Sequence, residues 1–395
     1  MKKDLNRLWN KLRASRFAMP VILLVFYLTL AAIFILIFEI NNNEHNHFEN
    51  FIDGIWWAIV TFTTTGYGDK FPTTYGGYII ATISIFLGIG AMSFLSGSLA
   101  SFFVERNLKI RRGLMNCSNM KDHFVICGWK EHIADILKGI LRLNKKISSE
   151  NIVIISNVEP ERVEELKNDK ELSGLRFIRG DYYSETALNR ANIKNAIRVL
   201  ILADELESHA SSEVDSKTVM TVLTIRGISR DVYISVELLD KKFEAYLKQA
   251  MCDEIILIRE YSRMLLANSS STNGITQILY HLLGVQEGGS RLYTSPIPKK
   301  YIGKPFVDYK NSVNAYTKSD LKEISRLTIG VLENTGSPYK LKMEALREAQ
   351  KTSDVSMLIS NLHEVKILEV NKPVLIPADD YAIQKNSMGI ILERT

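Results

Sequence analysis

The sequence has little cysteine: three residues in 395, none of them in a C-x-x-C pair. Cys117, Cys127 and Cys252 are far apart in the chain, which argues against a disulfide framework and against a thiolate zinc site. Isolated cysteines of this kind suit a protein that works in a reducing compartment. We expect all three to occupy core or neutral positions.

Charged side chains are missing from two long stretches. Residues 17–38, FAMPVILLVFYLTLAAIFILIF, contain none, and the run from Phe71 to Val104 contains none either. A helix over 17–38 would be about 33 Å long, enough to cross the hydrocarbon of a bilayer. A signal peptide would be shorter and would end in small residues, whereas EINNNEHNH follows here. Two spans of a lipid bilayer are therefore predicted.

Basic residues flank this unit on both sides. They concentrate in residues 1–16 and return in 106–112, whereas 41–74 contains Lys70 as its only Lys or Arg. Because cytoplasmic loops carry the excess of Lys and Arg, both ends of the unit are expected in the cytoplasm. The formal charge of the chain is only +5, so a membrane surface is a better partner for the basic N-terminus than nucleic acid.

The segment between the spans contains a short apolar run and a polar, glycine-containing one. DGIWWAIVTFTT (53–64) is too short to cross a bilayer and too apolar for a solvated loop, so a re-entrant half-helix is predicted. Its C-terminal end would favour a cation. In the following TTTGYGD, the glycines at 66 and 68 permit the positive φ angles that aim successive carbonyls the same way. Four copies could replace the water shell of a potassium ion; a simple hairpin turn is the alternative.

Trp56 and Trp57, followed by the signature T-x-G-Y-G-D, resemble the two-transmembrane potassium channels. The resemblance implies K⁺ held in a filter of Thr64, Thr65, Gly66, Tyr67, Gly68 and Asp69. Tyr67 would brace the filter against the pore helix, and the Thr64 hydroxyl would form the innermost ion site. Thr65 stands where the family usually has valine, so selectivity and inactivation are least predictable there.

Acidic residues lie on both sides of the filter sequence. Glu44, Glu49, Asp53 and Asp69 would, in four copies, make the outer mouth negative and concentrate cations. For each of them, a solvated surface position is the alternative. The EHNH run at 44–47 is interpreted as a polar loop rather than a metal site.

Two glycines, Gly88 and Gly90, interrupt the second span. Close packing of helices is one role for small residues in a membrane. The resemblance implies another for Gly88, a hinge at which the pore-lining helix bends during gating. Both roles stay open at this point.

Residues beyond 122 change to short apolar runs that alternate with amphipathic segments. Strands are predicted at 123–127, 151–156, 175–181, 198–204, 231–237 and 254–258, and helices at 131–143, 159–168, 184–190, 212–227 and 240–250. This alternation predicts a doubly wound, Rossmann-like parallel sheet. Ligands of such sheets bind at the carboxyl ends of the strands.

The first strand runs into C-G-W-K-E-H-I, where a dinucleotide fingerprint would need G-x-G-x-x-G. Only Gly128 is present, Lys130 replaces the second glycine, and the second strand ends in Ser156 and Asn157 instead of an acid. A hydride-transferring enzyme is therefore disfavoured, and we expect no enzymatic activity. Binding of ADP or NAD stays open because a helix N-terminus still offers N–H groups. The candidate nucleotide-binding residues are Gly128, Lys130, Asn157 and Asp181.

CGW and the run RGDYYSETALNRANI (179–193) resemble the RCK domain, also called the TrkA N-terminal domain. The resemblance covers about 121–284 and implies that residues from Arg259 form a helical crossover between paired domains. A small α+β lobe would follow, indicated by PIP (296–298) and 377–392. Residues 338–360 are interpreted as a helical insertion without an assigned role.

The resemblance also implies a regulatory metal in some members of the family. Its calcium ligands would fall on Asp204 and Glu237, but the third falls on Leu239, which cannot bind metal. Ca²⁺ prefers six to eight oxygens, so the site would need a substitute such as Glu205, Glu207 or Asp240.

Together these features predict a ligand-gated, potassium-selective channel in a bacterial or archaeal plasma membrane. Its segments would be a cytoplasmic N-terminus (1–16), a pore module (17–105), a linker (106–122), an RCK N-lobe (123–258), a dimerising crossover (259–290) and a C-lobe (291–395). The predicted assembly is a homotetramer. An internal start at Met115 or Met120 would add free RCK subunits to complete an octameric ring; rings of four domains or of two tetramers are the alternative. A regulatory subunit of a potassium transporter and a weakly selective cation channel are the alternative functions.

Overall fold

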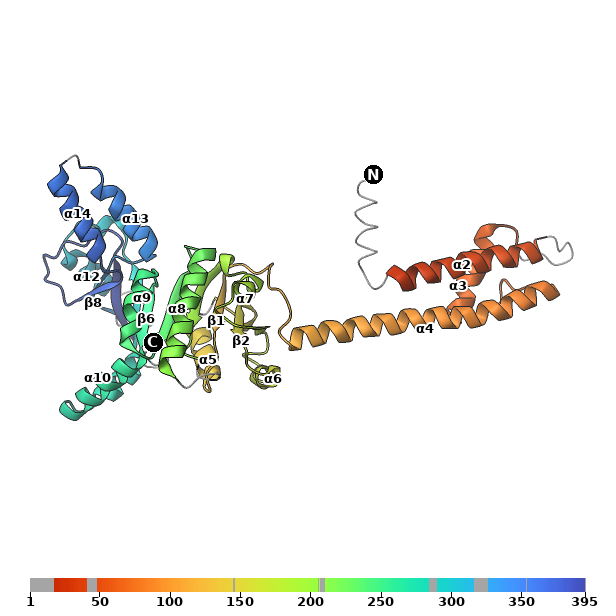
Figure 1. Ribbon diagram of the computed structural model, residues 1–395, viewed down its shortest axis with the longest axis horizontal. Coiled ribbons are helices and arrows are strands. Elements are labelled where there is room, and N and C mark those ends of the chain that lie inside the picture. The colour runs from red at the N-terminus through yellow and green to blue at the C-terminus, as the bar shows by residue number, and fades with distance from the viewer. Residues whose placement is uncertain are drawn as a thin grey trace. The chain divides into compact units, whose positions relative to one another are not determined.

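A computed structural model of the chain describes residues 18–40, 48–144, 146–204, 206, 210–283, 290–315, 326–352 and 354–394. The chain forms two compact units, Met1–Lys109 and Ile110–Thr395 (Figure 1). The predicted N-terminal segment 1–16 and the EHNH run lie outside the described residues.

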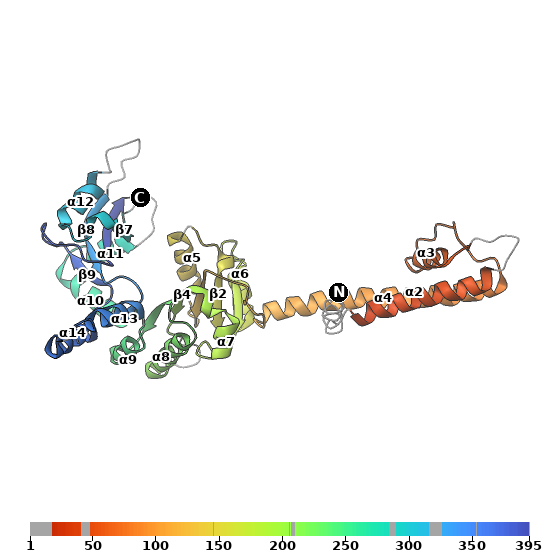
Figure 2. The same cartoon turned by 90° about the horizontal axis from the view of Figure 1, so that it is seen from above.

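The first unit contains the helices α2 (Ala18–Glu39), α3 (Phe51–Phe62) and α4 (Tyr75–Arg111). Both α2 and α4 are long and apolar enough to cross a membrane, whereas α3 is a short apolar helix. The helix α3 packs on α2 (Figure 2) through a buried cluster. The cluster contains Ala31, Ile35, Phe48, Trp57, Ala58 and Phe62. The two spans and the half-helix between them are thus present as predicted, although α3 ends at Phe62 instead of residue 64.

The second unit begins with a six-stranded parallel sheet in the order β3-β2-β1-β4-β5-β6. The strands are β1 (His123–Cys127), β2 (Ile152–Ser156), β3 (Arg176–Arg179), β4 (Ala196–Ile201), β5 (Tyr233–Leu238) and β6 (Glu254–Leu257). The strand order reverses between β1 and β4, so the crevice at their carboxyl ends is the expected ligand position. The predicted doubly wound sheet is confirmed.

Helices and short 3₁₀ turns connect these strands. They are α5 (Ile133–Leu143), η1 (Ser149–Asn151), α6 (Pro160–Lys167), α7 (Glu185–Arg190), η2 (Ile193–Asn195), α8 (Ser211–Ile228), η3 (Lys241–Phe243) and α9 (Glu244–Gln249). Two buried apolar clusters hold this lobe together, one of them centred on α5 and β2 and the other on β4, β5 and α8. All three cysteines are buried and free, as expected. Burial raises the pKa of the Cys252 thiol to about 12.

The predicted linker 106–122 differs from the structure. Its first part continues α4 to Arg111, because the helix does not end where the apolar stretch does. Its second part packs on the sheet domain: the Gly113 carbonyl accepts the Arg179 N–H at 2.9 Å, and Cys117 is buried. The segment is therefore part of two folded elements rather than a separate connector.

A crossover of α10 (Ile258–Ser271) and α11 (Ile275–Leu283) leads to the C-lobe. This lobe has an antiparallel sheet in the order β7-β10-β8-β9. Its elements are β7 (Ser290–Pro296), η4 (Lys299–Tyr301), α12 (Phe306–Ala315), β8 (Arg326–Glu333), β9 (Lys372–Leu375) and β10 (Met388–Arg394). Two helices, α13 (Pro338–Ala349) and α14 (Val355–Ile367), lie between β8 and β9 in the chain, so the insertion predicted at 338–360 extends further. The small α+β lobe is confirmed.

Candidate ion filter and regulatory site

The backbone after α3 alternates in handedness. Thr64, Gly66 and Gly68 have φ angles of 59°, 58° and 77°, and the residues between them have negative φ. Opposite-handed neighbours aim their N–H groups to one side and their carbonyls to the other. Two of the three left-handed positions are glycine, whereas a left-handed Thr64 costs about 1–3 kcal/mol. This alternation of φ is the backbone pattern that the predicted row of carbonyls needs, and the filter role of these residues stays a prediction.

The last turn of α3 holds the first part of this segment, residues 63–66, through hydrogen bonds. The N–H groups of Thr65 and Gly66 both donate to the Val60 carbonyl, at 3.0 and 3.3 Å. The Thr63 hydroxyl donates to the Ile59 carbonyl at 2.8 Å and lies 2.9 Å from the Thr65 hydroxyl. Thr65 can therefore donate to Thr63, so the Thr65 hydroxyl has a partner at the C-cap of α3.

Aromatic and acidic side chains hold the second part of the segment, residues 67–70. The Trp56 indole N–H donates to the Asp69 carboxylate at 2.8 Å, and the rings of Trp56 and Tyr67 are stacked with centroids 6.0 Å apart. Asp53 completes a capping box at the start of α3 by accepting the N–H of the N-cap residue Asn50 at 3.2 Å, and it pairs with Lys70 at 2.9 Å. Lys70 therefore offsets one of the carboxylates that we expected to make the outer mouth negative. Glu44, another of them, lies outside the described residues.

Glu39, which sequence reasoning missed, links the two membrane helices. It ends α2 and is 1% exposed, and its carboxylate accepts both the N–H and the hydroxyl of Thr73 and of Thr74, at 2.7–3.1 Å. These donors stand just before α4, so Glu39 holds its first turn. The Gly77 backbone is close enough that a Cβ there would collide with the same carboxylate. The sequence signal that could have revealed Glu39 is an acidic residue directly after the apolar run 17–38.

Gly88 lies inside an unbroken α4 and is buried. A Cβ at this position would be 2.6 Å from the Phe62 ring, whereas nothing lies within 4 Å of the equivalent point at Gly90. Close approach of α3 and α4 therefore requires glycine at 88. The hinge at Gly88 stays a prediction.

The first strand of the sheet domain ends in a tight turn. Gly128 has φ +91°, and a Cβ would lie 3.0 Å from the Leu202 carbonyl oxygen and 3.2 Å from Asp204 Cβ. Asp204 accepts the N–H groups of Trp129 and Leu206, both at 3.0 Å. The structure thus brings two predicted site residues, Gly128 and Asp204, together at the switch point.

Lys130 and Glu237 form an ion pair across this edge of the sheet. Glu237 is 5% exposed and also accepts the Ala203 N–H at 3.1 Å. An ammonium therefore already occupies the position beside Glu237 where a divalent cation would bind. Within the described ranges, no cluster of three or more His, Cys, Asp or Glu side chains is arranged for a metal, and Glu205 lies outside them.

Asp240, one of the predicted substitute ligands, is also engaged, and Glu207, another, lies outside the described residues. The Leu239 and Asp240 N–H groups donate to the buried Asp215 at 3.0 and 2.8 Å, and burial raises the pKa of that carboxyl. Asp240 pairs with Lys242 at 2.9 Å, and this ammonium holds the pKa of Asp240 below its usual value. Asp240 is therefore not placed as a substitute ligand in this conformation.

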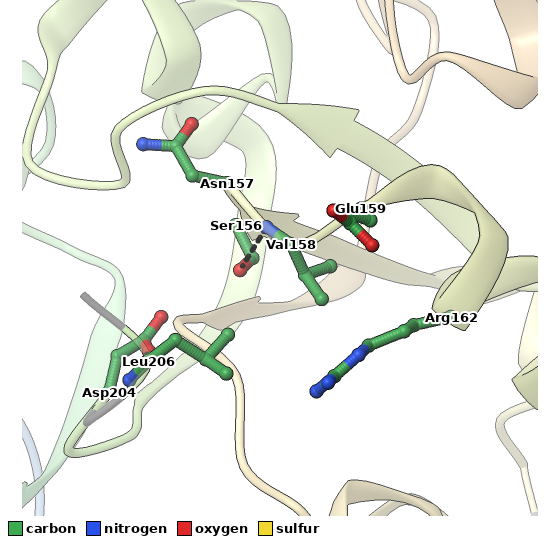
Figure 3. Close-up of a pocket in the computed structure, with 7 residues that line it drawn as sticks. All are labelled: Ser156, Asn157, Val158, Glu159, Arg162, Asp204 and Leu206. Atoms are coloured by element: carbon green, nitrogen blue, oxygen red, sulfur yellow. Dashed lines mark hydrogen bonds between the residues drawn. The ribbon is translucent and has the colours of Figure 1, made fainter.

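A pocket of about 280 Å³ lies beside Asp204. Its lining residues are Ser156, Asn157, Val158, Glu159, Arg162, Asp204 and Leu206 (Figure 3). Arg162 extends from α6 into this space, and none of the described residues pairs with its guanidinium. Asn157 instead hydrogen-bonds to Asp181, which brings together two predicted nucleotide-binding residues. Arg162 was missed because the helix position alone gives no signal of a pocket.

Replacement of Glu39 by Gln tests the link between α2 and α4. The amide has one acceptor oxygen for four donors, so half-buried donors at Thr73 and Thr74 lose partners, at a cost of about 1–3 kcal/mol. We expect a thermal unfolding midpoint several degrees lower in detergent. Glu49→Gln, at an exposed position, is the matched control and should leave the midpoint unchanged. Equal midpoints for the wild type and Glu39→Gln would contradict this role.

Comparison with known proteins agrees with both units. Residues 22–105 match the ion channel family, and residues 119–236 match the slowpoke-like RCK domain of calcium-activated potassium channels. The chain is 29% identical over 248 residues to the calcium-gated potassium channel TvoK of Thermoplasma volcanium, covering 62% of this chain and 67% of TvoK. It is 30% identical over 240 residues to the putative potassium channel protein YugO of Bacillus subtilis, covering 59% of this chain and 69% of YugO.

Among solved structures, the GsuK channel bound to NAD matches with a TM-score of 0.44 and 14% identity, over 95% of this chain and 57% of that one. The family of the chain follows from its sequence similarity to YugO and from the two matched domains. The chain belongs to the family of prokaryotic potassium channels in which a two-transmembrane pore module is followed by an RCK domain.

Proposed function

We propose that four copies of the chain form a potassium-selective channel in the plasma membrane of a bacterium or archaeon. Residues 64–68 of each copy would supply the filter carbonyls, with Asp69 at their outer end. The observation that carries this proposal is the alternating handedness at Thr64, Gly66 and Gly68, which directs the carbonyls to one side. Carbonyl rings of this kind replace the hydration shell of K⁺.

The cytoplasmic domains would form a ring that changes the open probability when a ligand binds. An internal start at Met115 is compatible with free ring domains, because that residue already belongs to the segment packed on the sheet domain: its carbonyl accepts from Arg190 at 3.2 Å. A start at Met120 would remove Cys117 from the buried core. We therefore favour Met115 if the ring contains eight domains.

We propose an adenine nucleotide, ADP or NAD, as the ligand. The relative TvoK is named as calcium-gated, and calcium is the second candidate. The pairing of Lys130 with Glu237 counts against calcium at this edge, because an ammonium neutralises the carboxylate that the metal would need. Arg162 supports an anionic ligand, since a guanidinium binds phosphate through two parallel hydrogen bonds.

Recording from the purified protein in planar bilayers tests the channel itself. With K⁺ on one side and Na⁺ on the other, we expect a reversal potential close to that of a potassium electrode. A reversal potential that is indifferent to the exchange of K⁺ for Na⁺ would favour the weakly selective channel. Absence of any current from the protein alone would favour the regulatory subunit of a transporter.

Replacement of Thr65 by Val tests the hydroxyl behind the filter. It removes one hydrogen bond, worth about 1 kcal/mol, between the filter and the pore helix. We expect potassium selectivity to persist and the occupancy of non-conducting states to change about fivefold in single-channel records. Thr65→Ser keeps the hydroxyl and should behave as the wild type. If Val and Ser variants gate alike, the hydroxyl has no role.

Replacement of Arg162 by Gln tests the ligand. A charge-assisted hydrogen bond is worth about 1.5–3 kcal/mol, so the concentration of ADP or NAD that half-maximally changes open probability should rise at least tenfold. Arg142→Gln, at an exposed position of α5, is the matched control. If calcium changed the open probability and neither nucleotide did, the nucleotide proposal would be contradicted and calcium would be the ligand.

A further inference from the structure

The α13–α14 insertion of the C-lobe docks on the sheet domain through its first turn. Lys340 pairs with Asp231 at 2.7 Å, and Arg230 donates to the Tyr339 hydroxyl at 2.8 Å. The Arg230 guanidinium also lies 5.0 Å from the centroid of the Tyr339 ring. Asp231 and Arg230 belong to the turn between α8 and β5. An exposed ion pair contributes little by itself, but the combination with a ring contact fixes the start of α13 on this turn.

A cavity of about 540 Å³ lies beside this contact. One wall comes from α9 and the start of β6, and the other from α13, the end of α14 and β9. Leu368 and Pro373 contribute apolar surface. The volume is within the range of about 300–1,000 Å³ that is typical of small-molecule sites. The insertion therefore supplies half of a pocket that the sheet domain alone does not have.

The charges that line this cavity do not balance. Glu244 pairs with Lys248 at 2.7 Å, and Asp253 pairs with Arg226 at 2.5 Å, so these acids are already neutralised. Three further lysines line the cavity, namely Lys342, Lys366 and Lys372. In the part of the chain that the structure describes, no ion pair or hydrogen bond engages their ammonium groups. Glu369 is the one remaining acid among the lining residues.

We propose that this cavity binds a small molecule with two or more anionic phosphate groups. Lysine ammonium groups on a common cavity attract phosphate oxygens, and three of them exceed the single opposing carboxylate. The site is separate from the nucleotide pocket at the ends of β2 and β4, which shares none of its lining residues. The ligand would contact both lobes at once, so its binding would favour the docked position of α13.

Calorimetric titration of pyrophosphate into the full-length channel tests the proposal. We expect saturable binding, weakened at least tenfold in the double variant Lys342→Gln, Lys366→Gln. Lys351→Gln is the matched control, because this lysine is on the same insertion but pairs with Glu348 and does not line the cavity. The charge-preserving pair Lys342→Arg, Lys366→Arg should retain binding and thereby exclude misfolding as the cause.

Arg162→Gln separates the two sites. Pyrophosphate binding at the interlobe cavity should survive this substitution, whereas any binding at the nucleotide pocket should not. The proposal is overturned if no saturable binding occurs up to millimolar pyrophosphate. It is also overturned if binding persists unchanged in the Lys342→Gln, Lys366→Gln variant, or if Arg162→Gln abolishes it.

Discussion

Backbone at membrane depth has no water to bond with, so each of its polar groups needs a partner within the protein or an ion. The candidate filter segment, residues 64–68, meets this requirement for its N–H groups and its carbonyls in different ways. The N–H groups of Thr65 and Gly66 bond to the last turn of α3, and the alternating φ angles leave the carbonyls for another partner. The remaining contacts of the pore unit, from the Trp56–Asp69 hydrogen bond to the Glu39 link, hold this one arrangement in place.

At the carboxyl edge of the parallel sheet, where ligands of such folds bind, the chain pairs charges of its own. Glycine is needed at 128 because the backbone lies close to the Leu202 carbonyl, but the second glycine position of the fingerprint holds Lys130, which pairs with Glu237. The ammonium neutralises a buried carboxylate without any bound ion. The space that remains open is displaced toward β2 and α6, where Arg162 lies. The accessible positive charge of this edge, the Arg162 guanidinium, therefore lies at α6 rather than at the glycine turn.

Much of this could be predicted from the sequence because the signals were local. The apolar runs located both spans, and the alternation of strands and helices gave the sheet within a few residues. The end of α4 was misplaced because hydropathy marks where lipid contact ends, at Val104, whereas the helix continues to Arg111. Glu39 and the Lys130–Glu237 pair were missed because their partners are 34 and 107 residues away, and the pairing exists only in the folded chain.

The connection between α4 and the sheet domain has almost no slack. Arg112 alone separates the last helical residue of α4 from Gly113. The Gly113 carbonyl accepts the Arg179 N–H of β3, and the two backbones are so close that a Cβ at Gly113 would collide with that nitrogen. A slack chain would absorb a small displacement of the sheet domain as changes in its own dihedral angles. A connection this short is stiff instead, so a displacement of the sheet domain would pull on α4 directly rather than be taken up by the chain between them.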